Sequence, residues 1–304
     1  MILRRGFTLV EMLIVVSILT LVAGMLLFAM QGVTEQARTR STETEIQRIS
    51  DVLLERWDSY KTRPVRVAAG AGLMQRRLNA LRELQRAELP ERKSDVTTGT
   101  VAMSPVQRGY QRKVLRLVQK VNPSHTISNW TTQHESAECL WLILGSLTVG
   151  DTNALSLLTE KEVGDTDGDG VPEVLDAWGV PLMFLRWAPG FSQSTLQGPG
   201  ATTPAIDVFD PLQADPRYFD GSGVRKQADV PVLFALTPLI ASAGPDKEFG
   251  LAFDIFGSSA PLNYAQTTPP NDPYFDPRPT LPQAGTADVS VNTWADNITN
   301  HLVE

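Results

Sequence analysis

The sequence predicts an α+β protein, with a long N-terminal helix packed on a small antiparallel β-sheet head that carries extra helices and long loops. Three observations favour this fold. An apolar run extends from Phe7 to Met30, a helical pattern without proline continues to Pro64, and short apolar segments in the C-terminal half are separated by loops rich in proline and glycine. With 304 residues, of which 42% are hydrophobic, the chain can also bury a packed soluble core.

The N-terminal segment favours a membrane anchor over a cleaved secretory signal. Arg4 and Arg5 precede the apolar run, as in the charged region of a signal peptide. The stretch from Met12 to Met30 alone spans about 28 Å as a helix, which is close to the hydrocarbon thickness of a bilayer and longer than the apolar core of a signal. Positive charge before the span and a polar remainder predict a single-pass membrane protein, with its N-terminus in the cytoplasm and the bulk of the chain outside.

The helical pattern becomes amphipathic after the apolar run. Four apolar side chains in residues 31–60 recur at spacings of three and four, on one face of a helix: Ile46, Ile49, Leu53 and Trp57. We therefore expect one continuous helix from about Phe7 to Tyr60. Its first half, residues 7–30, would lie in lipid, and its second half would pack on the head.

One charged residue, Glu11, interrupts the apolar run. An ionised carboxylate costs roughly 2.5 to 3.5 kcal/mol at mid-helix on insertion scales, and less toward a helix end. The surrounding letters, GFTLVEMLIVVSIL, are similar to the N-terminal signature of type IV pilins and of the pseudopilins of type II secretion systems. This resemblance implies a leader of residues 1–6, which a membrane prepilin peptidase cleaves after Gly6, and makes Phe7 the N-methylated first residue of the mature chain.

The same resemblance implies a role for Glu11 in assembly. As the fifth residue of the mature chain, it would neutralise the N-terminal amine of a neighbouring subunit when the apolar helices leave the lipid and bundle into a filament. A carboxylate facing an ammonium gains more in an apolar bundle than in water, and removing one of the two leaves a buried charge. The implied partners are other pilin or pseudopilin subunits, the prepilin peptidase and an inner-membrane assembly platform.

Residues 61–160 are predicted to form a helical insertion. Its first 60 residues hold 14 Lys and Arg against 4 Asp and Glu, and two basic amphipathic helices are expected there, one ended by Pro90 and one over residues 111–121. A solvated basic face is the more common outcome for such helices, so nucleic-acid binding is not expected. The letters DVTTGTVAMSPVQ predict a loop. The segment SAECLWLILGSLTVG predicts a buried helix, with Cys139 as a buried thiol.

The acidic loop of residues 165–176, DTDGDGVPEVLD, carries the strongest metal-binding pattern. Residues 161–304 hold 7 Lys and Arg against 19 Asp and Glu, which favours cations as partners. The oxygen-bearing positions of the loop match the offsets of an EF-hand loop, with Gly170 at the sharp turn, and carboxylates without histidine or cysteine suit Ca²⁺. The predicted ligands are Asp165, Asp167, Asp169, the carbonyl of Val171, Glu173 and Asp176.

Two departures from the EF-hand pattern leave an alternative open. Asp176 is shorter than the bidentate glutamate usual at the twelfth position, and Pro172 makes a flanking helix hard to start. A calcium loop without flanking helices and a metal-free acidic turn therefore both stay open. In the second case Asp176 would be structural and would cap the turn that follows it.

A second resemblance concerns residues 161–304, which are expected to form a calcium-loop and β-sheet region. The letters DAWGVPLMF are similar to the start of the β-region of the major pseudopilin and predict a strand within residues 180–185, while VPVLFALTPLIASAGPDKEFG predicts a buried strand and a turn. In the family a comparable turn binds Ca²⁺ together with a later aspartate. Lys247 replaces the usual glycine, and an insertion with the letters TTPPNDPYFDPRPTLPQ separates the two parts. The matching residues here are Ser242, Gly244, Asp246 and Asp296.

These expectations define a structural subunit rather than an enzyme, since the sequence contains no Ser, His and Asp set at a recognisable spacing and no phosphate-binding glycine loop. The leading hypothesis is a pseudopilin or pilin-like subunit that assembles through its N-terminal helix into a filament of a type II secretion system. The alternative is a type IV pilus or DNA-uptake pilin with a basic binding surface. The machine, the place of the subunit in the filament and the role of residues 61–160 stay open.

Overall fold

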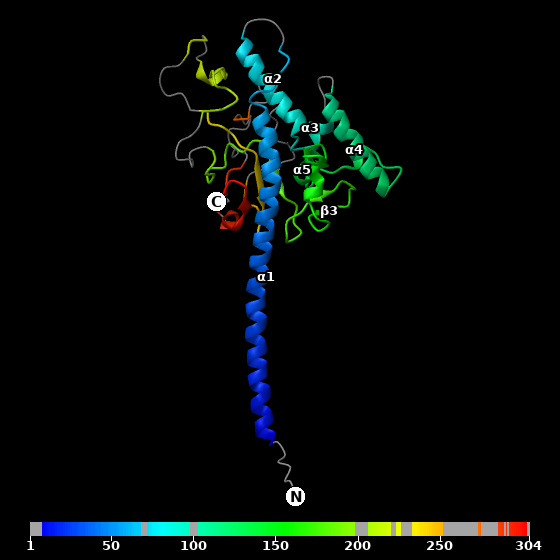
Figure 1. Cartoon of the computed structure of the whole chain (residues 1–304), viewed down its shortest axis with the longest axis vertical. Helices are drawn as coiled ribbons and strands as arrows, with labels where there is room; N and C mark the ends of the chain where they lie inside the picture. The colour runs from blue at the N-terminus through cyan, green and yellow to red at the C-terminus, as the bar shows by residue number, and fades with distance from the viewer. Residues whose placement is uncertain are drawn as a thin grey trace. The chain divides into compact units, whose positions relative to one another are not determined.

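The computed structural model describes residues 8–67, 72–97, 103–197, 206–219, 223–225, 233–251, 273–274, 285–288, 290 and 292–302 (Figure 1). The chain divides into two compact units, Met1–Ser41 and Thr42–Glu304, which we describe separately. The boundary between them falls inside helix α1 (Leu9–Ser59), so the predicted long N-terminal helix is confirmed over these residues.

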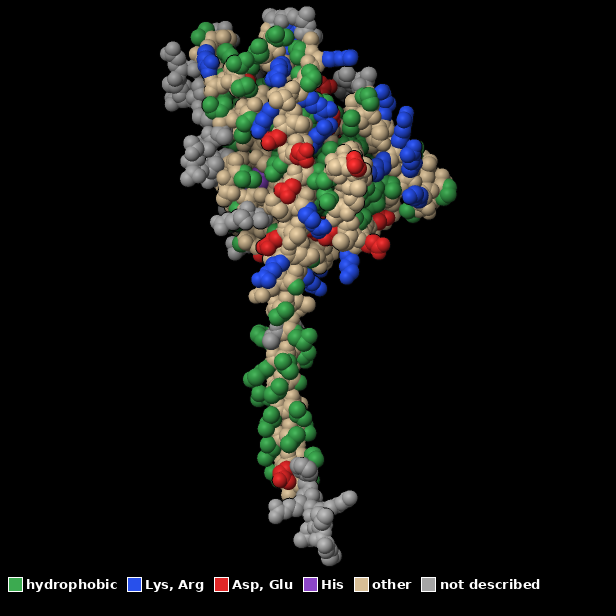
Figure 2. Space-filling view, viewed as in Figure 1, with side chains coloured by type: hydrophobic (Ala, Val, Ile, Leu, Met, Phe, Trp, Pro, Cys, Tyr) green, Lys and Arg blue, Asp and Glu red, His purple; other side chains and the backbone are tan. Residues whose placement is uncertain are grey.

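In the first unit, the apolar part of α1 exposes its side chains on all sides. Leu9 is 82% exposed and Phe28 is 81% exposed, and Figure 2 shows apolar side chains along the visible face of this segment. The helix is long and apolar enough to cross a membrane, by length and composition. An apolar helix whose described side chains are exposed in this way needs lipid or other protein around it.

In the second unit, the end of α1 is a core element of the head. The four apolar residues predicted to share one face are all buried: Ile46, Ile49, Leu53 and Trp57. The indole Nε1 of Trp57 donates a hydrogen bond to the carbonyl of Leu236 at 3.1 Å, and its ring meets that of Phe209 edge to face. The predicted amphipathic half of the helix is therefore confirmed.

In the described part of the segment that was predicted to be a helical insertion, four α-helices follow. They are α2 (Leu73–Glu88), α3 (Lys93–Thr97), α4 (Pro105–Val121) and α5 (Glu135–Leu144). Helix α4 begins before the expected residue 111, because Ser104 and Gln107 form a capping box and Pro105 occupies the first helical position. The prediction of a loop over DVTTGTVAMSPVQ is wrong at both ends, because its first residues belong to α3 and its last residues belong to α4.

Helix α5 lies in the core of the head rather than at its surface. It packs against strands β4 (Glu173–Val174) and β5 (Met183–Leu185), and nearly all its side chains are buried. Cys139 is a free, fully buried thiol, as predicted, and burial raises the pKa of that thiol. Residues 61–160 therefore supply part of the core and are not an appendage to it.

The predicted antiparallel sheet is confirmed and is small. Its three strands run in the order β5, β6 (Leu239–Ser242) and β7 (Ile298–Thr299), with Phe184 opposite Ile240 and Ser242 opposite Ile298. Two short antiparallel pairs lie outside this sheet. They are β1 (Thr148–Val149) with β2 (Thr152–Asn153), and β3 (Val163–Gly164) with β4. Short 3₁₀ turns complete the described elements: η1 (Ile127–Asn129), η2 (Ala154–Leu157), η4 (Pro216–Tyr218) and η6 (Asn292–Asp296).

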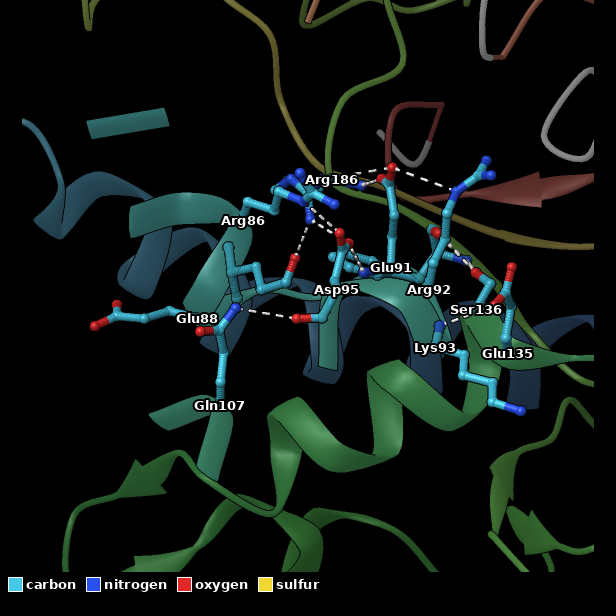
Figure 3. A network of polar contacts seen from close by, with 12 residues as sticks. Arg86, Glu88, Glu91, Arg92, Lys93, Asp95, Gln107, Glu135, Ser136 and Arg186 are labelled. Atoms are coloured by element: carbon cyan, nitrogen blue, oxygen red, sulfur yellow. Dashed lines mark hydrogen bonds and ion pairs between the residues drawn. The ribbon is translucent and has the colours of Figure 1, made fainter. Parts of the chain in front are cut away.

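A buried ionic network joins the middle helices to the sheet (Figure 3). Arg186, directly after β5 and fully buried, donates to the carbonyl of Leu89 at 2.6 Å and lies 3.2 Å from Asp95 and 3.5 Å from Glu91. Arg86 of α2 pairs with the other oxygen of Asp95. Burial alone would raise the pKa of Asp95, but the Arg186 and Arg86 charges hold it below its usual value.

Two arginines of α2 pair with buried carboxylates instead of forming the solvated basic face that was expected. Arg82 is 2% exposed, and its guanidinium donates to a carboxylate oxygen of Asp215 at 3.2 Å. Because Arg82 and Arg86 neutralise buried carboxylates, the basic character of α2 serves the packing of the head. The expectation of a solvated face is wrong for these two residues.

His301 holds the C-terminal segment in place. Its Nε2 donates to the Pro238 carbonyl at 3.1 Å, and its Nδ1 accepts from the Ser194 hydroxyl at 2.8 Å in the neutral tautomer that satisfies both contacts. The ring meets that of Phe191 edge to face. Burial lowers the pKa of His301 to about 4.

We predict that the head loses stability as pH falls from about 6.5 to about 4. The unfolded chain binds a proton at His301 in this window and the folded chain does not, so the loss from this residue is about 3 kcal/mol. Urea unfolding at several pH values tests this. His301→Gln should flatten the pH dependence in this window, and an unchanged slope in the variant would refute the assignment.

We predict that Arg186→Met destabilises the head by about 3 to 5 kcal/mol, because Glu91 and Asp95 lose a buried counter-charge. The matched control is Arg112→Met on α4, where the side chain is exposed and the change should stay within about 0.5 kcal/mol. Chemical denaturation of both variants measures the difference. Equal losses would show that the network does not hold the helices to the sheet.

Candidate functional site

The N-terminal motif is described from Thr8 onward, and the predicted processing residues Gly6 and Phe7 lie outside the described residues. Glu11 folds back onto Thr8 at the start of α1. Its Oε2 accepts from the Thr8 amide at 2.8 Å and from the Thr8 hydroxyl at 2.9 Å, while the Glu11 amide donates to that hydroxyl at 3.2 Å.

This arrangement is a capping box, which satisfies amide groups that have no partner inside the helix. The sequence analysis missed it, although Thr8 and Glu11 stand at the threonine-x-x-glutamate spacing that signals a helix start. Within one chain Glu11 thus has a local partner that is neutral. Its carboxylate is not opposed by a positive charge in any ion pair of the described residues.

The acidic loop joins β3 to β4, and three of its predicted ligands come together. Oxygen atoms of Asp165, Asp167 and Asp169 lie within 4.8 Å of one another. The loop closes on itself through its own amides, since Asp165 accepts from Gly168 at 2.8 Å and Gly170 at 3.0 Å. The positive φ of Gly170, 92°, allows the sharp turn that the sequence predicted at this position.

A second group of carboxylates lies deeper and includes a residue that the sequence analysis missed. Oxygens of Glu138, Asp167 and Glu173 also lie within 4.8 Å of one another. Glu138 comes from α5, is fully buried and accepts a hydrogen bond from Trp130 Nε1 through Oε2. Burial raises the pKa of Glu138 to about 10; the bond from Trp130 opposes the rise, and the charge of Asp169 adds to it.

Asp176 is not brought together with the other predicted ligands. Its Oδ1 accepts from the amides of Trp178 and Val180, each at 2.9 Å, and its Oδ2 accepts from the Ser242 hydroxyl at 2.6 Å. This geometry agrees with the alternative role, a cap for the turn. Val171 is buried in the core, and its amide donates a hydrogen bond to Asp169 Oδ1 at 2.8 Å. Calcium coordination by the Val171 carbonyl stays a prediction.

The residues of the second predicted calcium loop are only partly brought together. The Asp246 amide lies 3.4 Å from a carboxylate oxygen of Asp296, and both side chains are exposed. The Ser242 hydroxyl instead faces Asp176. Lys247, which replaces the family's glycine, has a φ of 65°, so the backbone keeps a conformation that favours glycine. Calcium binding at this loop stays a prediction.

A basic strip remains exposed on α4. Four of its residues, spaced by four, point to solvent: Arg108, Arg112, Arg116 and Lys120. Figure 2 shows Lys and Arg side chains gathered over this edge of the head. The predicted solvated basic face is therefore present on α4, whose opposite face packs through Tyr110, Val114 and Val118.

Comparison with protein families identifies the N-terminal segment. Residues 1–27 match the family model described as the prokaryotic N-terminal methylation motif. The chain therefore carries the N-terminal signature of type IV pilin-like proteins, and its α+β architecture agrees with a pilin-type fold. Comparisons with curated proteins and with solved structures give no match. The resemblance of the C-terminal half to the major pseudopilin stays a prediction.

We predict that Gly244→Ala destabilises the head more than Gly150→Ala does. Both glycines have a positive φ, 69° and 58°, so alanine strains each backbone by about 1 to 2 kcal/mol. Only at Gly244 would the new Cβ meet another segment, 2.5 Å from the Asp296 carbonyl oxygen, and this crowding should add at least about 1 kcal/mol. Urea unfolding of both variants measures the difference, and equal losses would contradict the close approach of the two segments.

Proposed function

We propose that this chain is a structural subunit of a type II secretion filament, a pseudopilin rather than an enzyme. The methylation motif over residues 1–27 supports a pilin-like subunit processed by a prepilin peptidase. The observation that carries the proposal is the apolar part of α1, which is exposed on all sides and begins with a carboxylate at Glu11. In the membrane, lipid covers this surface, and in a filament, the same surface of other subunits covers it.

Assembly then depends on an exchange of partners at Glu11. In the stored subunit the carboxylate caps its own helix through Thr8. In the filament it faces the N-terminal amine of the neighbouring subunit, where the low dielectric of packed apolar helices strengthens the attraction. The assembled state is favoured because a positively charged amine replaces the neutral Thr8 as the partner of the carboxylate. The subunit sits in the inner membrane with its head in the periplasm, and an assembly platform moves it into the filament.

A type IV pilus or DNA-uptake pilin is the second candidate, and the exposed basic strip on α4 favours it. Phosphate backbones bound by such a strip would be released as salt rises, with a steep logarithmic slope. A deletion strain separates the two machines. Loss of secreted proteins with surface fibres retained supports the secretion system, and loss of fibres or of DNA uptake with secretion retained supports the pilus.

We predict that the mature protein begins at Phe7 and carries an N-methyl group there. Mass spectrometry of the protein from its native cells tests this, because leader removal and methylation both change the mass of the N-terminal peptide. The control is a strain without prepilin peptidase, in which Met1 should be retained. Retention of Met1 in cells with an active peptidase would refute the proposal.

We predict that Glu11→Ala leaves membrane insertion intact but reduces the fraction of subunits in filaments by tenfold or more, equivalent to at least about 1.4 kcal/mol per contact. The control is Glu35→Ala, which removes a carboxylate from the same helix outside the motif. Fractionation of membranes and sheared filaments gives both readouts. Normal incorporation of the Glu11 variant would contradict the assembly role.

A further inference from the structure

Five carboxylates from three segments of the head form one acidic cluster. The loop between β3 and β4 supplies three of them, β4 supplies one, and α5 supplies the fifth across the core. Two groups form within this cluster, each with oxygens inside 4.8 Å, and they share Asp167. The five residues are Asp165, Asp167, Asp169, Glu173 and Glu138.

The charge of the cluster is not balanced by an ion pair within the described part of the chain. None of the ion pairs among the described residues involves these five carboxylates. Neutral donors satisfy part of it, since the Thr131 amide and hydroxyl donate to Asp169 and Asp167. Like charges at this spacing repel one another strongly in a partly buried site, so the arrangement needs a cation or bound protons.

The geometry of Glu138 favours a bound cation at this cluster. Its side chain is fully buried, and its Oε1 has no hydrogen-bond partner among the described residues, while Oε2 receives the Trp130 indole. One carboxylate oxygen of Glu138 lies within 4.8 Å of oxygens of Asp167 and Glu173, so a cation bound among them would satisfy a buried carboxylate that the described residues leave partly without a partner.

We propose that Glu138 completes a Ca²⁺ site with the acidic loop, in the place that the EF-hand spacing had predicted for Asp176. Asp165, Asp167, Asp169 and Glu173 keep the loop positions, and the long side chain from α5 supplies the carboxylate that a loop without a flanking helix cannot supply itself. Asp176 is then free to cap the turn at Trp178 and to bind Ser242. The inference does not depend on the proposed secretion function.

The ligand chemistry selects calcium among common cations. All five ligands are carboxylates, which are hard oxygen donors, and the cluster includes no histidine or cysteine of the kind that Zn²⁺ prefers. Oxygens drawn from a loop and from a helix suit the higher coordination number and flexible geometry of Ca²⁺ better than the compact octahedron of Mg²⁺. The ion ties the β3–β4 connection to α5, which is a core helix.

The test is calorimetric titration of CaCl₂ into the chelator-treated full-length chain in detergent. All titrations use an Asp246→Asn background, which silences the other predicted calcium loop. Glu138→Gln keeps size and shape but removes the charge, and we expect it to weaken Ca²⁺ binding at least about tenfold. Glu135→Gln, one turn earlier on α5 and outside both carboxylate groups, and Asp176→Asn should bind as the parent does.

Thermal unfolding separates a ligand from a merely structural residue. Without Ca²⁺, Glu138→Gln should melt at or above the parent temperature, because the amide has the same size and shape and carries no charge that burial and the neighbouring carboxylates would disfavour. With Ca²⁺, the parent should gain stability and the variant should gain much less. A variant that loses the same stability with and without Ca²⁺ would overturn the proposal, as would a parent that binds no Ca²⁺ at millimolar concentration.

Luminescence of Tb³⁺, a calcium substitute, gives an independent readout at the same place. The Trp130 indole is hydrogen-bonded to Glu138, so excitation of tryptophan should sensitise an ion bound there. Ca²⁺ should displace the emission, and Glu138→Gln should reduce it. If Glu138→Gln does not fold, Asp165→Asn on the exposed loop provides the second variant, and unchanged Tb³⁺ emission in it would also overturn the proposal.

Discussion

The exposed apolar half of α1 is the constraint on which the rest of the protein depends. Between Leu9 and Met30 the described side chains of the helix are exposed, and nearly all of them are apolar. Each large apolar side chain that leaves water gains about 1.5 to 3 kcal/mol, so this segment requires either lipid or other apolar helices at all times. A subunit built this way has two environments, and a small electrostatic preference can decide between them.

In the assembly proposed above, Glu11 would supply that preference through a change of partner. Its box with Thr8 is a local device that any single chain can form, and it lowers the cost of a carboxylate near lipid by giving it hydrogen bonds. The box leaves the negative charge without a counter-charge. A bundle of helices that places an N-terminal amine next to Glu11 gains the attraction of opposite charges in an apolar environment. A single subunit in the membrane lacks this attraction.

The head is organised to keep the end of α1 fixed. Ile46, Ile49 and Leu53 are core residues, so the helix cannot be pulled from the head without exposing the core. The sheet itself is small, and the surrounding helices and loops are held to it by buried charges. Arg186 joins α2 and α3 to β5, and Arg82 joins α2 to Asp215. Such contacts stabilise a head whose strands are only two to four residues long.

Local patterns in the sequence predicted the parts of the fold that depend on periodicity. The buried face of α1, the buried helix α5 and the turn at Gly170 all follow from spacing and residue type alone. The ionic network and the second carboxylate group were missed, because they join residues that are far apart in the chain. Glu138 comes close to Glu173 only because α5 packs against β4, and no local spacing in the sequence predicts that contact. Asp176 fits both a metal pattern and a turn pattern, and its contacts with the Trp178 and Val180 amides and with the Ser242 hydroxyl favour the cap.

The most direct test of the account is carbodiimide cross-linking of assembled filaments, which joins a carboxylate to an amine in contact with it. The account predicts covalent dimers and higher multimers in which the linked peptide connects the Phe7 amine of one subunit to Glu11 of another, and their loss in Glu11→Gln. Linked peptides found only in monomers, or multimers that persist without the Glu11 carboxylate, would contradict the claim that this charge pair holds neighbouring subunits together.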